Sequence, residues 1–221
     1  MNTLLTAPVA PLLTRLFAEA KAADAGMRAQ LDRSTPEEVA AFMSRANTDY
    51  RGFYGMAKDL FLPVSPETGR LLYLLVRASG ARSVIEFGTS FGLSTIHLAA
   101  ALKDNGGGRV IGSEFEPAKV TQARDNLRAA GLAEFAEIRE GDALETLARD
   151  LPASIDLLLL DGAKVLYPQV LALVESWLRP GALVLADNAD HNPDFLAYVR
   201  SPANGYLSVP FADDVELFMR N

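Results

Sequence analysis

Acidic and amide side chains stand where two apolar runs of the chain end. Asp161 closes the run IDLLLLD, and Asp187 and Asn188 end ALVLADN. Two carboxylates and an amide oxygen are hard ligands that suit Mg²⁺ or Ca²⁺, and adjacent anions favour a bound cation. Taken singly, each aspartate reads as a helix cap. Because Lys164 follows Asp161 by three residues, the combination instead indicates a site.

A glycine-containing loop follows another apolar run, RSVIEF. Gly88 and Gly92 would let the backbone turn tightly and approach a ligand, with helix N–H groups pointing outward. Their GxxxG spacing differs from the GxGxxG of dinucleotide-binding folds, and plain turn geometry is the alternative interpretation. Glu86 precedes the loop on a buried strand, where a carboxylate needs partners, and this favours a functional loop.

Further polar residues follow the next two runs. Glu114 ends the run RVIGSE, where a carboxylate can accept hydrogen bonds from both hydroxyls of a ribose. The alternative is a solvated acid at a strand end, and we interpret Glu116 in that way. Asp142 and Ala143 follow the next predicted strand, residues 135–139. Five polar groups therefore converge on one edge of the predicted sheet, as a ligand site requires.

A doubly wound parallel sheet would bring these groups together, since short apolar runs alternate with helical segments after Pro63. We predict a seven-stranded α/β sheet whose last strand pair is antiparallel. The expected strands are 82–87, 109–114, 135–139, 155–161, 182–187, 206–209 and 215–219. The expected helices are 94–102, 117–130, 143–149, 167–178 and 194–200. Residues 1–62 should form a helical arm, with helices at 12–23 and 37–45, and residues 63–221 the ligand-binding domain.

The composition narrows the function classes. The 221 residues carry a net charge of −7 and show no clustered Lys and Arg, so we expect no nucleic-acid partner. Cysteine is absent, which excludes disulfides, thiolate metal sites and a cysteine nucleophile and fits a reducing compartment. The N-terminus lacks the basic start of a signal peptide, and no apolar stretch approaches the ~20 residues of a membrane span. We therefore expect a cytoplasmic protein without a membrane partner.

At these motifs the chain resembles the cation-dependent O-methyltransferases of the catechol and caffeoyl-CoA type, within the class I S-adenosylmethionine-dependent methyltransferases. The resemblance covers roughly residues 60–221, and the matching segments are VIEFGTSFGLS, RVIGSEFEP, LLLLDGAK and GALVLADN followed by PDFLAYVR. It implies a Rossmann-like methyltransferase sheet, Mg²⁺ held by Asp161, Asp187 and Asn188, and Lys164 as the catalytic base.

The resemblance also implies the cofactor contacts. Glu114 would bind the ribose of S-adenosylmethionine, and Asp142 and Ala143 would lie near its adenine. The full set of implied cofactor residues is Val64, Glu86, Gly88, Thr89, Ser90, Gly92, Ser94, Glu114, Asp142, Ala143 and Asp161. Ser90 replaces a glycine found in many methyltransferase loops. The first 60 residues match nothing specific; in relatives this part covers the acceptor or forms the dimer contact, and we expect a homodimer.

The implied reaction moves a methyl group to one hydroxyl of a vicinal dihydroxy, catechol-like small molecule. Mg²⁺ would bind both oxygens of the diol, and Lys164 would remove a proton. The ordinary pKa of lysine, near ~10.4, is too high for a base at neutral pH, so we expect the cation and the sulfonium to lower it. No counterpart is evident of the acidic residue that contacts the second hydroxyl in the catechol enzyme, so the acceptor stays open.

Two rival functions use the same fold. A nicotinamide-dependent oxidoreductase predicts GxGxxG, which is absent, and a non-catalytic S-adenosylmethionine-binding protein predicts loss of the lysine or of a metal ligand, yet all four positions are present.

Other residues have plainer interpretations. We expect His97 and Trp177 to be packed. His191 is expected to be exposed in a loop, with a substrate contact as the alternative. The segment containing Arg51, Phe53, Tyr54 and Met56 either lines the acceptor pocket or simply packs.

Overall fold

A seven-stranded sheet forms the centre of the molecule in the computed structural model, which describes residues 2–211 and 214–221, apart from the side chains of residues 40, 43 and 45–47. The strand order is β3-β2-β1-β4-β5-β7-β6. β1 (Ser83–Phe87), β2 (Arg109–Glu114), β3 (Ala136–Glu140), β4 (Ile155–Leu160) and β5 (Leu178–Ala186) run parallel. β7 (Val215–Arg220) is antiparallel to both β5 and β6 (Tyr206–Phe211). The predicted doubly wound sheet with an antiparallel final pair is confirmed.

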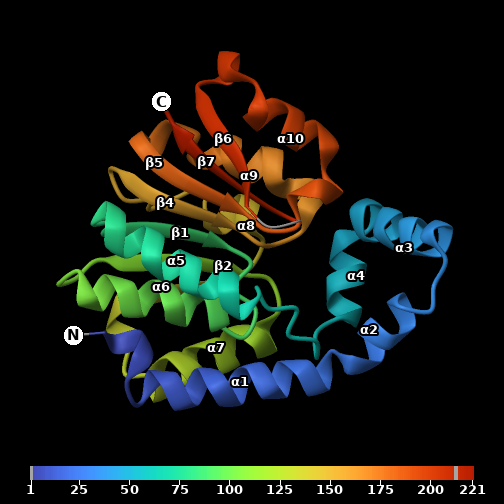
Figure 1. The fold of residues 1–221 in the computed structure, drawn as a ribbon, viewed down its shortest axis with the longest axis horizontal. Helices are drawn as coiled ribbons and strands as arrows, with labels where there is room; N and C mark the ends of the chain where they lie inside the picture. The colour runs from blue at the N-terminus through green and yellow to red at the C-terminus, as the bar shows by residue number, and fades with distance from the viewer. Residues whose placement is uncertain (1, 212–213) are drawn as a thin grey trace.

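Helices cover both faces of this sheet (Figure 1). Leu157 and Leu159 of β4 pack in one core with the helices at Val9–Ala23, Pro66–Ser79 and Leu93–Asp104, whereas Leu158 and Leu160 pack in the other with those at Tyr167–Val174 and Pro193–Arg200. All four leucines are fully buried, because successive side chains of a strand point to opposite faces and both faces are covered. The order reverses between β1 and β4, so the carboxyl ends of these two strands flank the position where doubly wound sheets bind ligands.

The helices on the two faces follow the strands that they connect. α5 (Pro66–Ser79), α6 (Leu93–Asp104) and α7 (Pro117–Ala129) lie on the first face, and α8 (Ala143–Thr146), α9 (Tyr167–Val174) and α10 (Pro193–Arg200) on the second. The sequence analysis missed α5, although its start carries a cap and an N-terminal proline. Ser65 accepts a hydrogen bond from the N–H of Thr68, and Gly80 ends the helix in the left-handed conformation.

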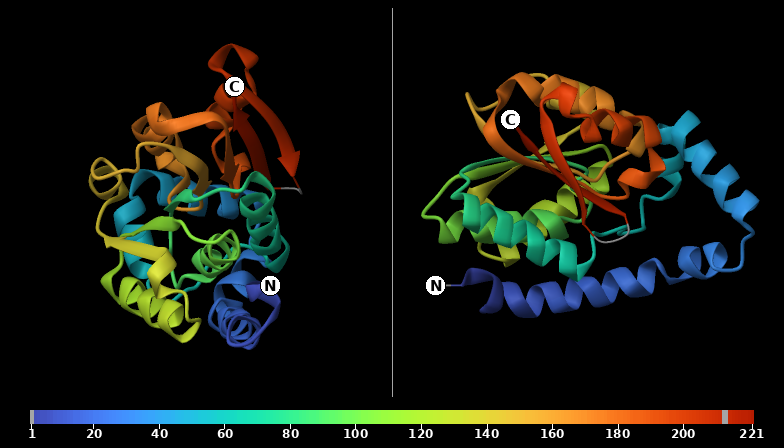
Figure 2. Two further views of the ribbon diagram at one scale, coloured as in Figure 1. Left: turned by 90° about the vertical axis from the view of Figure 1, so that its left-hand side faces the viewer. Right: turned by 45° about the horizontal axis from the view of Figure 1, so that its top comes forward.

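The first 60 residues are helical, as predicted, and comprise α1 (Val9–Ala23), α2 (Ala25–Leu31), α3 (Pro36–Thr48) and α4 (Tyr50–Met56). α1 packs along the domain against α6, and α2 to α4 then extend beyond it and return (Figures 1 and 2). One carboxylate links the start of α2 to the segment that follows α4. Asp24 is fully buried and accepts the N–H groups of Phe61 at 2.8 Å and Leu62 at 3.0 Å. The division at residue 62 into two domains stays a prediction.

Two sequence-based expectations near β5 are wrong. The helix expected over 167–178 ends at Val174, and after a short turn β5 begins at Leu178 rather than at residue 182. Trp177, expected in the core, lies in that turn and is 43% exposed. Within the described part of the chain, no helix is long and apolar enough to cross a bilayer.

Candidate functional site

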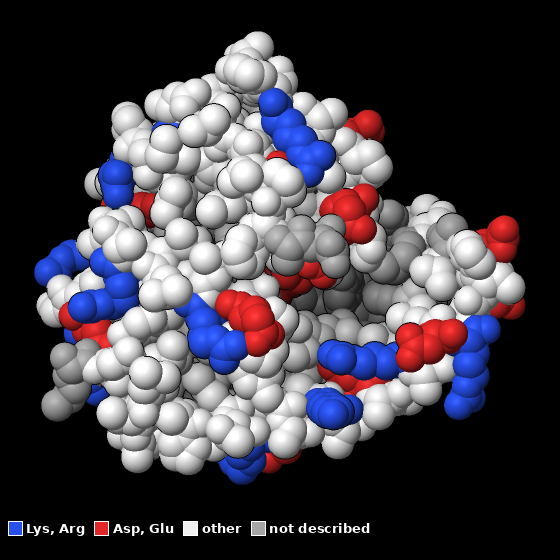
Figure 3. Space-filling model, in the orientation of Figure 1, with Lys and Arg blue, Asp and Glu red and all other residues white. Residues whose placement is uncertain are grey.

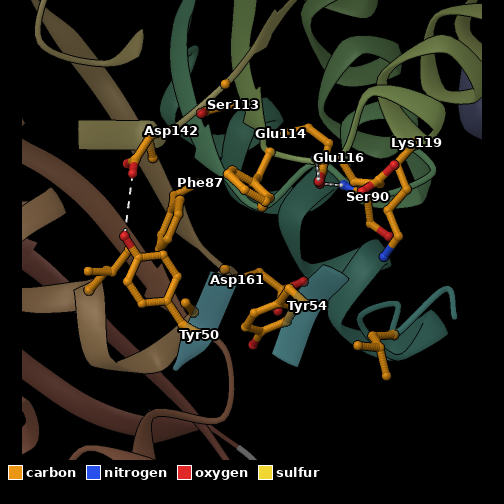
Figure 4. Close-up of a pocket in the computed structure, with 18 residues that line it drawn as sticks. Tyr50, Tyr54, Phe87, Ser90, Ser113, Glu114, Glu116, Lys119, Asp142 and Asp161 are labelled. Atoms are coloured by element: carbon orange, nitrogen blue, oxygen red, sulfur yellow. Dashed lines mark hydrogen bonds between the residues drawn. The ribbon is translucent and has the colours of Figure 1, made fainter. Parts of the chain in front are cut away.

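A cavity lies at the carboxyl ends of β1, β2 and β4 (Figure 4); we call it the strand-end cavity. Its wall includes six of the residues predicted to bind the cofactor: Gly88, Ser90, Glu114, Asp142, Ala143 and Asp161. Tyr50 and Tyr54 reach it from α4 of the arm, a contribution that the sequence analysis did not assign to this cavity. The predicted convergence of strand-end polar groups is therefore present in the structure.

Glu114 is fixed at the end of β2 by two backbone N–H groups. One carboxylate oxygen accepts the N–H of Ser90 at 2.7 Å and the other that of Glu116 at 2.8 Å. Ser90 itself has φ 49°, a left-handed conformation that favours glycine, and its hydroxyl donates to the carbonyl of Phe61 at 2.7 Å. Carboxylate oxygens retain further acceptor positions, so Glu114 can still bind ligand hydroxyls.

Glu86 supports the glycine loop from behind and is absent from the wall of the strand-end cavity. It is fully buried and accepts hydrogen bonds from the hydroxyls of Thr89 at 2.8 Å, Ser94 at 2.7 Å and Thr95 at 2.6 Å. Burial raises the pKa of Glu86, and the three hydroxyls act in the opposite direction. Glu86 therefore orders the loop and the start of α6, and its predicted contact with a cofactor is indirect in this geometry.

The two loop glycines are required by close backbone packing. A Cβ on Gly88 would collide with the carbonyl of Asp161, so this glycine brings the ends of β1 and β4 together. A Cβ on Gly92 would lie 3.3 Å from the Cβ of Ala123, so Gly92 lets the loop approach α7. Both glycines also have positive φ, which strains any other residue except in special cases.

A small recess adjoins the strand-end cavity on the side of the glycine loop. Val64, Thr89 and Ser94 line it together with Gly88, Ser90 and Asp161. This recess thus forms one continuous surface with the strand-end cavity. It contains the residues predicted to lie along the methionine end of the cofactor, except Glu86.

The arm is tied to this cavity through Asp142. Arg51 of α4 forms an ion pair of 2.5 Å with Asp142, and the hydroxyl of Tyr50 lies 3.4 Å from the same oxygen. Asp142 also caps α8 by accepting the N–H of Leu144 at 2.9 Å. Burial opposes ionisation, but these donors hold the pKa of Asp142 below its ordinary value. Arg51 therefore does not line an acceptor pocket, which was one interpretation of its segment.

The predicted metal ligands lie together at the ends of β4 and β5. Asp187 is 8% exposed, and burial together with the nearby charge of Asp161 raises its pKa to about 8. Burial also raises the pKa of Asp161, although the Lys164 ammonium, 3.1 Å from its Oδ1, opposes the shift. Burial thus opposes the ionised form of both carboxyl groups, and a bound divalent cation would favour that form.

The lowered pKa expected for Lys164 depends on the charges of a cation and a sulfonium and stays a prediction, because the protein groups alone act in the opposite direction. Burial alone would lower it, but Tyr167 and Asp161 raise the pKa of Lys164 well above the ordinary value. The protein groups by themselves thus keep this lysine protonated and paired with Asp161. Tyr167, which the sequence analysis assigned only to a helix, also braces the site. Its hydroxyl lies 2.8 Å from the carbonyl of Leu160 and 2.7 Å from that of Asp187.

Asn188 adopts the left-handed conformation, with φ 48°, directly after β5. Its amide nitrogen donates to Asp214 at 3.2 Å, which leaves the amide oxygen, the atom that binds cations, outside this bond. Asp214 is an acid that the sequence analysis did not identify. It follows β6 in the chain and reaches Asn188 only through the antiparallel pairing of the last strands.

A second cavity, which we call the aromatic cavity, lies between the arm and the domain. Its polar wall consists of Asp161, Lys164, Asn188 and His191, and its apolar wall of Met27, Leu31, Phe42, Phe53, Tyr54 and Leu62. Asp161 and Tyr54 line the strand-end cavity as well, so the two cavities meet at these side chains. Figure 3 shows this side of the molecule hollowed between arm and domain, with acidic side chains on the wall of the hollow.

Several secondary expectations have clear outcomes. Phe53 and Tyr54 line the aromatic cavity, whereas Met56 is 66% exposed and outside it. His191 is partly exposed and reaches the polar wall of the cavity. His97 is buried, as expected.

Comparison with known proteins agrees with this geometry. A family model described as a methyltransferase domain matches residues 85–189, a segment that begins within β1 and extends past the end of β5. The chain shares 35% identical residues over 130 positions with a catechol O-methyltransferase of Niastella koreensis, and 35% over 136 positions with one of Mycobacterium tuberculosis. These matches cover 58% and 62% of this chain, and 58% and 61% of the relatives.

Solved structures of O-methyltransferases share the fold. TomG from Streptomyces achromogenes, solved with S-adenosylmethionine, superposes with a TM-score of 0.65 at 29% identity, covering 81% of this chain and 89% of TomG. An O-methyltransferase from Bacillus cereus, solved with S-adenosylhomocysteine, gives 0.63 at 25% identity, covering 91% and 100%. The Rossmann-like sheet and the resemblance to O-methyltransferases predicted from the sequence are confirmed.

Proposed function

We propose that the protein is a divalent-cation-dependent O-methyltransferase that moves a methyl group from S-adenosylmethionine to one hydroxyl of a vicinal dihydroxy compound. The observation that carries this proposal is the junction at Asp161, where the strand-end cavity meets the aromatic cavity. A methyl donor in the first cavity and an acceptor in the second would face each other there. Such placement supplies much of the rate in a group transfer.

The donor set fits a magnesium ion. Asp161, Asp187 and Asn188 offer three oxygen ligands, the kind that Mg²⁺ prefers, and a bound cation would offset the burial that raises the pKa of both carboxyl groups. The bound ion would act as a Lewis acid that lowers the pKa of a hydroxyl. Three protein ligands leave positions open in an octahedral shell, and two adjacent hydroxyls can fill neighbouring positions. A vicinal diol is therefore favoured over a single hydroxyl.

Lys164 is the proposed proton acceptor. Its side chain lies on the polar wall of the aromatic cavity, next to the proposed metal ligands. The acidic groups around it favour its charged form, so positive charge brought by ligands is needed to make its Nζ a base. Turnover should then depend on both ligands being present before the proton moves.

The aromatic cavity suits a flat acceptor. Phe42 and Phe53 meet edge to face at 5.0 Å, and Phe53 and Tyr54 at 5.3 Å. These rings face a polar wall, so an aromatic ring can pack on one side while its hydroxyls turn to the other. The names of the catechol O-methyltransferase relatives support this choice of acceptor. Action in the cytoplasm and assembly as a homodimer stay predictions; light scattering tests the second.

The test pairs a catechol with its matched monophenol, with mass detection of the methylated product. We expect methylation of the diol, loss of activity in EDTA and recovery with Mg²⁺. Asp187→Ala should resist recovery, whereas Asp190→Ala, an exposed neighbour, should recover normally. Equal rates on both acceptors, or full activity in EDTA, would refute the metal-diol proposal. Calorimetry with S-adenosylhomocysteine and NAD separates the methyltransferase from the oxidoreductase alternative.

A further inference from the structure

Lys119 is a buried lysine on the wall of the strand-end cavity, in the first turns of α7. It is 5% exposed, and Figure 4 shows its side chain entering the cavity beside Ser90 and Glu116. Within residues 2–211 and 214–221 its ammonium has no hydrogen bond or ion pair, and it lies over the ring of Phe91, 5.4 Å from Nζ to the centroid.

The ammonium faces the cavity that Lys119 lines and has no protein acceptor within the described residues. A ligand oxygen in the cavity could therefore accept a hydrogen bond from it. Burial lowers the pKa of Lys119, although the charge of Glu114 opposes the shift. Buried ionisable groups that lack a partner and face a cavity are candidates for ligand contacts.

The neighbouring acid, Glu114, does not pair with the lysine in this geometry. Glu114 is fixed by the N–H groups of Ser90 and Glu116 and makes no ion pair with Lys119. A hydroxyl placed between the two side chains could donate to the carboxylate and accept from the ammonium. A pair of adjacent hydroxyls offers this twice.

We infer that Lys119 acts together with Glu114 in binding the ribose hydroxyls of the adenosyl ligand, an inference that rests on the proposed methyltransferase function. The other acceptors in that ligand are the methionine carboxylate and the ring nitrogens of adenine, and the adenine is expected near Asp142 and Ala143. Lys119 does not line the recess of Val64 and Ser94, where the methionine end is expected. The cavity wall that it shares with Glu114 is the wall assigned to the ribose.

Binding measurements on Lys119→Met test the inference. Methionine keeps an unbranched chain against Phe91 and removes the donor. We expect the Kd for S-adenosylhomocysteine and for methylthioadenosine, which has the ribose but no carboxylate, to rise at least about tenfold each by calorimetry, the size of a lost hydrogen bond to a charged group. Lys103→Met, an exposed lysine on α6, should leave both Kd values unchanged.

A stability measurement separates ligand binding from a structural role. Because the lysine has no partner in the protein, Lys119→Met should unfold at the same or a higher temperature than the parent without ligand. Lys119→Gln, which keeps a donor, should recover part of the affinity. Unchanged Kd values, or a loss for S-adenosylhomocysteine only, would overturn the ribose assignment. If the parent protein itself binds no S-adenosylhomocysteine, the proposed function fails instead.

Discussion

Mild acid is expected to destabilise the fold through His97, which lies on α6 beneath the arm. The side chain is 3% exposed, its Nδ1 donates to the carbonyl of Leu93 at 2.8 Å, and its ring is tilted against Phe17 of α1. The other ring edge abuts Gly69 of α5, where a Cβ would lie 2.7 Å from Cε1. Among the described residues, only the Leu93 carbonyl accepts from the ring, so protonation would place a buried charge without a further acceptor.

The size of the effect follows from the pKa. Burial lowers the pKa of His97 from 6.5 to about 4, and the charge of Arg70 acts in the same direction. The unfolded chain thus takes up a proton near pH 6.5, while the folded protein does so only near pH 4. Stability falls as the pH decreases through this window, by up to about 3.4 kcal/mol at about 1.36 kcal/mol per pKa unit. By pH 4.5 most of that loss, roughly 2.4 kcal/mol relative to pH 7, should have occurred.

Urea unfolding at pH 7.0, 5.5 and 4.5 measures this loss against a matched control. The chain has two histidines, and His191 is partly exposed in a loop. Between pH 7.0 and 4.5, the free energy of unfolding of His97→Gln should fall by about 2 kcal/mol less than that of the parent, because the substitution removes only the contribution of His97 protonation. His191→Gln should follow the parent. The same pH dependence in His97→Gln and the parent would refute the assignment.

Three further substitutions give separate readouts. Glu114→Ala should weaken S-adenosylmethionine binding by about 1.5–3 kcal/mol in calorimetry, the range for hydrogen bonds to a charged group, and an unchanged affinity would remove it from the site. Lys164→Met should lower kcat by ~10²–10⁴ while S-adenosylhomocysteine still binds; near-normal turnover would show that this lysine is not the base. Asp24→Ala should lower the free energy of unfolding by about 2–4 kcal/mol, because it leaves the N–H groups of residues 61–62 without acceptors; Asp32→Ala, an exposed neighbour, should have little effect.

The strands and their terminal acids could be predicted because both signals are local. The run ending at Asp161 is apolar on both faces, and acids at strand ends fall on one edge when the strands are parallel. The helix 66–79 was also open to prediction, since Ser65-Pro66-Glu67 repeats the start signal of Thr35-Pro36-Glu37. By contrast, the end of α9 was misjudged because apolar periodicity continues through a turn that only tertiary packing defines.

The contacts that complete the site were not local, and no spacing rule reveals them. Arg51 and Asp142 are 91 positions apart and meet only because α2 to α4 leave the domain at Asp24 and return to it at Phe61. Lys119 follows Glu116 near the start of a helix and reads in sequence as a solvated side chain; only the fold places it inside the cavity. A sequence pattern can thus identify which acids meet at a sheet edge, since strand direction fixes that. It identifies an opposing cation only where one follows closely in the chain, as Lys164 follows Asp161, whereas Arg51 and Lys119 come from helices whose positions depend on the whole core.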